Sequence, residues 1–358
     1  MKKFLFFIVL LVGSSFTIQA QTVRIVDNNQ GAATGFTTID AAIQASQPMD
    51  TIYVQPSPNT YPNVNINKPI NIYGIGHNPE LNAGQYAYIH TITFSGAASG
   101  TKISGLFITT LNLNTNNTNH DVVITNNRFN GTITGRSNTS QTNNIVISGN
   151  YFEHGSTNFI DNNLGQNWII SNNLMQRSGT NWSWNLVTDL NNTTIFNNNI
   201  ILSRQIGDTN QQVEIFATCN GTQISNNIII FTGNSVANMN IGANLSLTFN
   251  NNLTYSVVTA FDALGGSNFD DVDPQFVSFD PNNSLNNTTH DYNIQGGAPH
   301  ENMGSDGNNL GVMNGVFPFS LRGYPTELPY LTDFVIFNNI LSEGTDLNIN
   351  IKADANNN

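Results

Sequence analysis

The stretch that decides the fold is Val-Val-Ile-Thr-Asn-Asn-Arg-Phe at residues 122–129, a β-branched run followed by asparagine and a large apolar residue. Close variants of it return five more times, as IVISGNYF at 145–152, WIISNNLM at 168–175, TIFNNNI at 194–200, QISNNII at 223–229 and LTFNNNL at 247–253. With the key asparagines at 127, 150, 173, 198, 227 and 251, the intervals are 23, 23, 25, 29 and 24 residues. Such a period indicates a solenoid, in which each repeat buries its apolar face only against its neighbours.

The local pattern of each repeat indicates strands and not helices. Each copy is rich in Ile, Val, Thr and Phe, alternates with period two and ends in Asn or Gly, which is typical of a strand followed by a turn. Asparagine tolerates the left-handed backbone of a tight corner, and its amide can bond to the same asparagine one coil away. We therefore predict that the repeated asparagine stands at the corner, in a ladder that begins with Leu106 as an apolar rung.

The chain divides into four segments. We predict a secretory signal peptide at 1–20 with cleavage near Ala20, because Lys2 and Lys3 precede an apolar run and small residues follow it. The other segments are an N-terminal cap with the first coils at 21–75, further coils at 76–311 with the asparagine repeats at about 120–255, and a C-terminal part at 312–358. The last comprises a wrapping arm at 317–330 and two strands, which we expect to form a hairpin over the lower edge of the solenoid.

The N-terminal cap carries a resemblance to a known superfamily. Thr37-Thr38-Ile39-Asp40 has the form of a capping box and predicts a short helix near 37–46. The phrases FTTIDAAIQA, DTIYVQP, NTY and INKPINIYGIG follow in that order and resemble the cap and first coils of the pectin-lyase-like superfamily. This resemblance covers roughly residues 34–260 and implies an all-β, right-handed parallel β-helix.

The resemblance does not extend to an enzyme family. The NTD, GHG and RIK phrases of polygalacturonases, the Asp-Phe-Ile-Phe-Gly phrase of pectin methylesterases and the Arg-x-Pro-x-x-Arg of pectate lyases are all absent. No catalytic residue can therefore be carried over. We expect a secreted protein that binds carbohydrate or presents a structural surface, and the alternative is a polysaccharide lyase or hydrolase of an unrecognised kind. Threonine rows suggest a third idea, ice binding, but they do not repeat in every coil.

Charge and composition limit the possible partners. Without the two lysines of the signal, 9 basic residues stand against 23 acidic ones, which gives a net charge of about −14. Such a surface repels nucleic acid and anionic membranes, and the scarcity of cations disfavours polyanionic sugars. No later apolar run is long enough to cross a bilayer. We expect a monomer with an extracellular glycan as its partner.

Stacking of the repeats predicts one patch of functional side chains. Counted from the ladder asparagine, Glu153 and Gln176 share one position, and His154 and Arg177 share the next. Equivalent positions in a parallel stack lie about 4.8 Å apart, and Arg204 is expected one coil further along. A carboxylate, an imidazole and a guanidinium could serve as a general base and an anion-stabilising group, although a solvated turn explains the same residues.

Further candidates lie near this patch. Trp182 and Trp184 alternate onto one face of a strand, where they form either a platform for sugar rings or part of the core. Asp189 could accept hydrogen bonds from sugar hydroxyls.

For the aspartates near residue 271 and for Cys219, we prefer a structural role to a functional one. Asp270, Asp271 and Asp273 could hold calcium, but their spacing is not that of an EF-hand, and a structural turn is the favoured interpretation. We therefore expect no cofactor. Cys219 is the only cysteine, so an intrachain disulfide is excluded, and we expect a small apolar side chain inside a coil.

Overall fold

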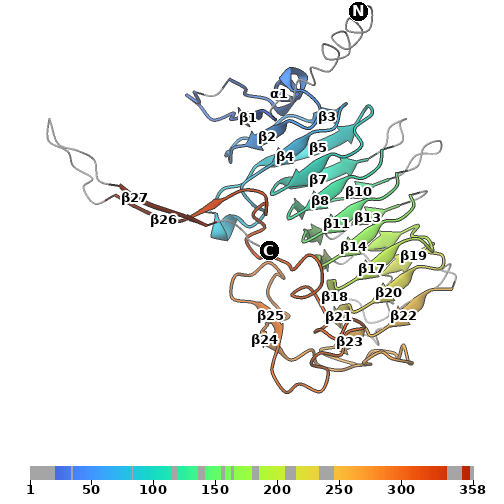
Figure 1. Ribbon diagram of the computed structural model, residues 1–358. Coiled ribbons are helices and arrows are strands. Elements are labelled where there is room, and N and C mark those ends of the chain that lie inside the picture. Colours follow the sequence, from blue (N-terminus) through green and yellow to red (C-terminus); the bar gives the residue numbers. More distant parts are fainter. Residues whose placement is uncertain are drawn as a thin grey trace, which may run out of the picture.

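The structure is a computed structural model, and two long parallel sheets dominate it (Figure 1). It describes residues 21–33, 35–82, 84–113, 119–135, 142–154, 158–162, 165–179, 185–205, 215–233, 246–336 and 349–354. Ten strands form sheet A, and thirteen strands form sheet B, which branches below its third strand. The predicted parallel β-helix is confirmed, while its right-handedness stays a prediction.

Each coil contributes one strand to sheet A. In spatial order these strands are β1 (Val23–Val26), β2 (Thr51–Val54), β4 (Asn71–Tyr73), β6 (Lys102–Ser104), β8 (Val123–Thr125), β11 (Val146–Ser148), β14 (Ile169–Ser171), β17 (Ile195–Asn197), β20 (Gln223–Ser225) and β22 (Thr248–Asn250). The middle residues of β6, β8, β11, β14, β17 and β20 pair in register and point into the coil, where they form an apolar column. This column is the Ile or Phe that precedes each asparagine by three positions.

Sheet B supplies the other two sides of the coil. Its upper strands are β3 (Val64–Ile66), β5 (Tyr88–Phe94) and β7 (Phe107–Asn112). One branch continues as β9 (Arg128–Phe129), β12 (Tyr151–His154), β15 (Leu174–Gly179), β18 (Ile200–Gln205), β21 (Ile228–Phe231) and β23 (Leu253–Ser256). The second branch is β10 (Ile133–Thr134), β13 (Ile160–Asp161), β16 (Val187–Thr188) and β19 (Phe216–Ala217).

The asparagine ladder lies between sheet A and the first branch. Its members are Asn127, Asn150, Asn173, Asn199, Asn227, Asn252 and Asn268. In each step the amide Nδ2 and the backbone N of one asparagine donate to Oδ1 of the next, at 3.2 and 2.9 Å from Asn127 to Asn150. Leu106 occupies the first rung, as predicted, because its backbone N donates to Oδ1 of Asn127. The ladder therefore satisfies buried backbone groups that no strand reaches.

Two details of the predicted ladder are wrong. The fourth and sixth asparagines of the ladder are Asn199 and Asn252, one residue beyond the predicted Asn198 and Asn251. The ladder asparagines also do not take the left-handed conformation; the residue before each of the first six does. This corner column comprises Asn126, Gly149, Asn172, Asn198, Asn226 and Asn251, whose φ angles lie between 53° and 67°. In each pair, the first residue thus forms the corner and the second forms the ladder bonds. One residue cannot do both, because its side chain would have to point both outward and into the coil.

A short helix and a returning segment complete the body. Helix α1 (Ile39–Ala45) is capped by Thr38, whose Oγ1 accepts from the backbone N of Ala41 at 3.3 Å, and its buried face covers the upper coils as predicted. The short 3₁₀ helix η2 (Pro79–Leu81) and the antiparallel pair β24 (Phe276–Ser278) and β25 (Asp291–Ile294) lie outside the coils.

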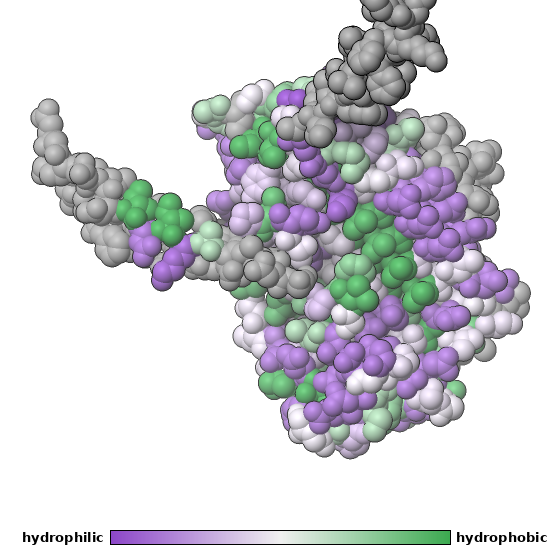
Figure 2. Space-filling view, viewed as in Figure 1, coloured by the Kyte–Doolittle hydropathy of each residue, from purple (hydrophilic) through white to green (hydrophobic). Residues whose placement is uncertain are grey.

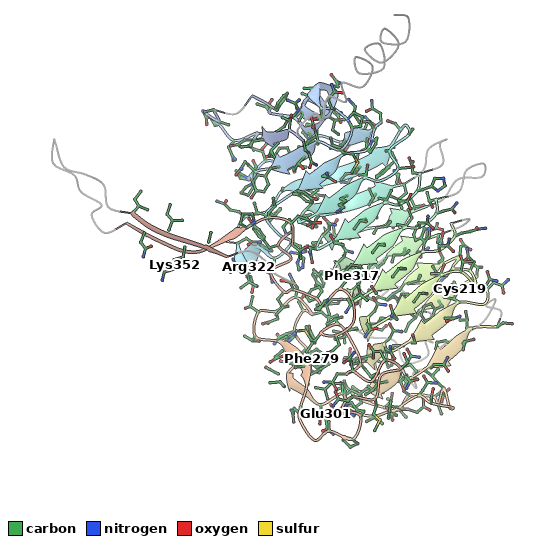
Figure 3. The ribbon with its side chains drawn as sticks, in the orientation of Figure 1. Cys219, Phe279, Glu301, Phe317, Arg322 and Lys352 are labelled. Atoms are coloured by element: carbon green, nitrogen blue, oxygen red, sulfur yellow. The ribbon has the colours of Figure 1, made fainter. Side chains whose placement is uncertain are left out.

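The C-terminal hairpin is confirmed, but it does not cover the lower edge. Strands β26 (Tyr330–Ile336) and β27 (Ile349–Asp354) pair only with each other and stand away from the solenoid, as the position of Lys352 shows (Figure 3). The chain first returns upward along the coils, and its residues 322 and 323 pack against Gly76 and His77. The hairpin therefore begins near the upper coils and is too far from the lower edge to close it.

Candidate functional site

The corner column holds the returning chain against the solenoid. Nδ2 of Asn251 donates to Met303 O at 2.9 Å, and Nδ2 of Asn226 donates to Oγ of Ser305 at 2.9 Å. Higher up, the amides of Asn198, Asn172 and Asn126 donate to the carbonyls of Gly311, Val312 and Tyr324 at 3.3, 2.9 and 3.3 Å. Residues 303–324 thus run upward along one corner of the coils, secured by one clamp at each of these rungs.

One rung of the corner column lacks a clamp. Gly149 replaces asparagine there, and the nearest atom to a Cβ built on it would be Oδ1 of Asn126 at 2.8 Å, with no atom of the returning chain among its three nearest neighbours. Gly105 shows the contrasting case, because a Cβ there would collide with the ring of Pro325, 2.8 Å away. The returning chain packs directly on Gly105 but stands clear of Gly149. The clearance opens into a groove of about 410 Å³, a size typical of ligand sites.

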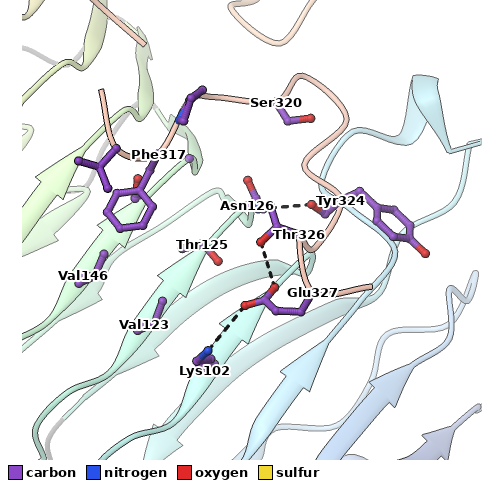
Figure 4. Close-up of a pocket in the computed structure, with 14 residues that line it drawn as sticks. Lys102, Val123, Thr125, Asn126, Val146, Phe317, Ser320, Tyr324, Thr326 and Glu327 are labelled. Carbon is purple, nitrogen blue, oxygen red and sulfur yellow. Dashed lines mark hydrogen bonds and ion pairs between the residues drawn. The ribbon is translucent and has the colours of Figure 1, made fainter. Parts of the chain in front are cut away.

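The groove lies between the outer face of sheet A and the returning arm (Figure 4). Val123, Thr125, Val146 and Ser148 form its floor. The arm contributes the opposite wall, on which Phe317 overhangs the valines while Ser320 and Tyr324 stand on the other side. The lining therefore combines aliphatic and aromatic surface with hydroxyl and amide groups.

An ion pair marks the upper end of the groove. Nζ of Lys102 lies 3.9 Å from Oε1 of Glu327, and both side chains are substantially exposed. Burial raises the pKa of Tyr73, and the nearby Glu327 carboxylate raises it further. Its phenol therefore stays neutral at physiological pH. The opposite charges of Lys102 and Glu327 offset each other, so the groove offers hydrogen-bonding groups without a net charge at this end.

The floor of the groove continues down the outer face of sheet A as two rows. Val123, Val146, Ile169 and Ile195 pair in register, from half-buried valines to an isoleucine that is 42 % exposed. Figure 2 shows the hydrophobic patch that gathers over these strands. Two positions further along each strand is a polar row, Thr125, Ser148, Ser171, Asn197 and Ser225.

Glu153 and Gln176 pair in register as predicted, but each already has a partner. Oε2 of Glu153 accepts from Nη2 of Arg128 at 2.9 Å, and the guanidinium of Arg128 lies over the rings of Phe107 and Tyr151. Oε1 of Gln176 accepts from the backbone N of Leu285 at 2.7 Å, and Gln176 is buried. The C-terminal segment thus covers half of the predicted patch.

Arg177 pairs with His154 in register, one position beyond the first pair. Strand alternation places Arg177 on the face opposite to Gln176, and Arg177 is only 8 % exposed. The predicted patch is therefore split between two faces of sheet B. Arg204 pairs with Ser178 and not with Arg177, so its position is also shifted by one residue.

Other predicted residues can be placed only in part. Trp182 and Trp184 lie outside the described residues, as do the side chains of His154 and Arg204. Asp189 adopts a left-handed conformation, and its Oδ1 accepts from the hydroxyl of Thr218 on the neighbouring coil.

A smaller cleft of about 210 Å³ includes Glu153 and Arg128. Glu80 of η2 and the amides of Asn78, Asn286 and Asn287 complete its walls. The cleft brings two carboxylates and one guanidinium together, which is the closest that the described residues come to the predicted acid–base patch.

The aspartates at 270, 271 and 273 bind backbone groups. The Asp270 carboxylate accepts from the N atoms of Leu264 and Gly265, Asp271 from Ser256, and Asp273 from Gln275. These are the bonds of structural turns. Among the described residues, no group of three or more His, Cys, Asp or Glu side chains is placed to hold a metal ion. Cys219 lies in the interior of the coil, and burial raises the pKa of its thiol to about 12.

The groove was missed at the level of sequence, although one signal for it was present. Among the six repeats that define the period, only the copy at 145–152 has glycine in place of the first asparagine. Glycine and asparagine both suit a left-handed corner, so the sequence pattern alone does not set Gly149 apart from the other corner residues. Its missing amide matters only when a returning chain passes over the corner.

No protein-family model matches the chain, and a search among curated proteins finds no similar sequence. Within the part of the chain that the structure describes, no helix is both long and apolar enough to span a bilayer.

Proposed function

We propose that the protein binds an extracellular carbohydrate in the groove between sheet A and the arm. The observation that carries the proposal is the open corner at Gly149, where a fold that clamps its arm at neighbouring rungs leaves a space of about 410 Å³. Sugars present both apolar ring faces and hydroxyls. The groove matches them with the Phe317 ring and Val146 on one side and with Thr125 and Ser320 on the other.

The remaining parts of the proposal come from the sequence. The lysine-flanked apolar run at 1–20 supports export with cleavage near Ala20, and the cap phrases support membership of the pectin-lyase-like superfamily. We also propose that the exported chain acts as a monomer.

The alternative function, a hydrolase or lyase, rests on the cleft at Glu153. Glu80 and Glu153 line this cleft together with Arg128, so an acid, a base and a cation are available in one place. Glu153 is already paired with Arg128, which favours binding over turnover. An assay for reducing ends and unsaturated products on plant and algal polysaccharides decides between them. Activity that Glu153→Gln abolishes supports the alternative.

The proposal is tested by closing the groove without disturbing the fold. Gly149→Asn introduces the residue that the neighbouring corners use at the same φ, so the backbone remains unstrained. Its Cβ would lie 2.8 Å from Oδ1 of Asn126, so the Asn126 side chain must shift, and the new amide would occupy the space over the floor. We expect a glycan array to identify a ligand for the wild type that this variant no longer binds.

Gly266→Asn is the matched control. Gly266 has φ +66° against +67° for Gly149, and a Cβ built on it has nothing within 4 Å. This variant should bind as the wild type does. Equal binding by Gly149→Asn, with its melting temperature unchanged, would show that the groove is not the carbohydrate site.

A further inference from the structure

The groove is blocked at one end and open at the other. At the upper end the Lys102–Glu327 pair and the passing arm lie across the sheet. At the lower end the floor residue Val146 pairs in register with Ile169, and Ile169 with Ile195, and neither isoleucine lines the groove. A ligand longer than the groove can therefore extend in one direction only, down the solenoid.

The exposed face below the groove has a regular repeat along the solenoid axis. Successive rungs of sheet A are separated by about 4.8 Å, so the aliphatic row from Val123 to Ile195 extends over roughly 14 Å. The polar row runs beside it at the same spacing, from Thr125 through Ser148 and Ser171 to Asn197. Ser148 and Ser171 are buried, so the surface of this face is formed by the aliphatic row, with the half-buried Asn197 beside Ile195. A periodic apolar surface of this kind matches a polymer whose units repeat in the same way.

Charge restricts the kind of polymer. Among the described residues that form the groove and the two rows, Lys102 is the one cation, and it is paired with Glu327. A polyanion would meet no free positive charge on this face and would approach a chain of strongly negative net charge. A chain of uncharged sugars meets neither obstacle.

We propose that the bound carbohydrate is a linear, neutral glycan that lies along the solenoid axis. One end occupies the groove beneath Phe317, and the following sugars rest on Ile169 and Ile195 with their hydroxyls toward Asn197 and the solvent. This inference rests on the proposed carbohydrate function and adds to it the class of ligand, its direction and its minimum length.

The test uses a homologous series of oligosaccharides prepared from the best ligand on the array. Isothermal titration should show affinity that increases with chain length until the chain covers the rungs from β8 to β17, and is constant beyond that length. Ile195→Ser should weaken binding of long oligomers about fivefold and leave the shortest binding oligomer unchanged. Ile195 is 42 % exposed, so the variant should keep its melting temperature.

Failure of the inference is distinguishable from failure of the proposed function. The extended binding mode would be overturned if short and long oligomers bind with equal affinity, if Gly149→Asn abolishes the binding of both, and if Ile195→Ser changes neither. The groove would then remain the binding site. Tighter binding of an oligouronide than of its neutral counterpart at equal length would overturn the neutral class. If Gly149→Asn leaves binding intact, the groove is not the carbohydrate site, and neither the extended binding mode nor the neutral ligand class has a basis.

Discussion

The outer faces of the two sheets carry the same kind of apolar row but have different environments. On sheet B, Tyr151, Leu174, Ile200 and Ile228 are completely buried, because residues 276–321 pack over them. Phe279 belongs to the part of this segment that covers sheet B, whereas Phe317, near the end of the segment, lies over sheet A (Figure 3). On sheet A, Val123, Val146 and Ile169 are half-buried and Ile195, at the end of the row, is 42 % exposed. The same kind of outward-facing apolar row is thus part of the core on sheet B and a candidate binding surface on sheet A.

The largest expected effect comes from truncating one residue in each row. Leu174→Ala removes a side chain that is 0 % exposed beneath the covering segment, and we expect a loss of about 3 kcal/mol in the free energy of unfolding. Ile195→Ala removes a side chain on the open face and should cost less than about 1 kcal/mol. Chemical denaturation followed by circular dichroism measures both. Equal losses would mean that the two faces are covered alike.

The covering segment should also make the stability depend on pH. His77 lies beneath it against the rings of Phe319 and Tyr151, and burial lowers the pKa of His77 to about 3, with the charge of Arg128 as the second cause. The unfolded chain binds a proton near pH 6.5, while the folded chain does so only near pH 3. Stability from this residue is therefore complete above pH 6.5 and is lost as the pH falls toward 3.

At pH 5 this loss should amount to about 2 kcal/mol relative to pH 7. Denaturation curves at the two pH values measure it, with His77→Gln as the comparison because glutamine does not titrate. All other titrating groups are the same in the two proteins, so the difference between their curves isolates His77. The same pH dependence in wild type and His77→Gln would contradict this assignment.

The smallest effect concerns the clamps that hold the returning chain. Asn172→Gly keeps the left-handed corner but removes the amide that bonds to Val312, and we expect a loss of about 1 kcal/mol. Asn167→Gly is the matched control, since Asn167 has the same conformation and bonds only to exposed groups of the neighbouring coil. Thermal unfolding compares them. A control that loses as much as Asn172→Gly would show that glycine itself, and not the clamp, causes the change.

The fold was predictable because its information is local and repeated. Six copies of one phrase fix the period, the strand and the turn, and the capping helix follows from Thr38 and Asp40. The one-residue errors at Asn198 and Asn251 arose where three asparagines stand in a row, because the strand pattern alone cannot choose among them. The sequence also cannot show that Asn172 forms the left-handed corner while Asn173 forms the ladder bond, because both residues are asparagine.

The candidate site was not predictable because it depends on contacts between distant segments. The patch proposed from Glu153 and Arg177 combined residues that alternate onto opposite faces, and it could not foresee that Leu285 would bond to Gln176. Gly149 alone signalled the groove, yet its meaning depends on an arm more than 150 residues away in the sequence.

The account depends most directly on which face a ligand covers. Hydroxyl-radical footprinting of the wild type, with and without the best glycan from the array, reports the protection of individual side chains. We predict protection of Phe317, Val146, Ile169 and Ile195, with no change at Arg128 or at Trp182 and Trp184. Protection confined to the tryptophans or to the Glu153 cleft, with the sheet A row unchanged, would contradict the account.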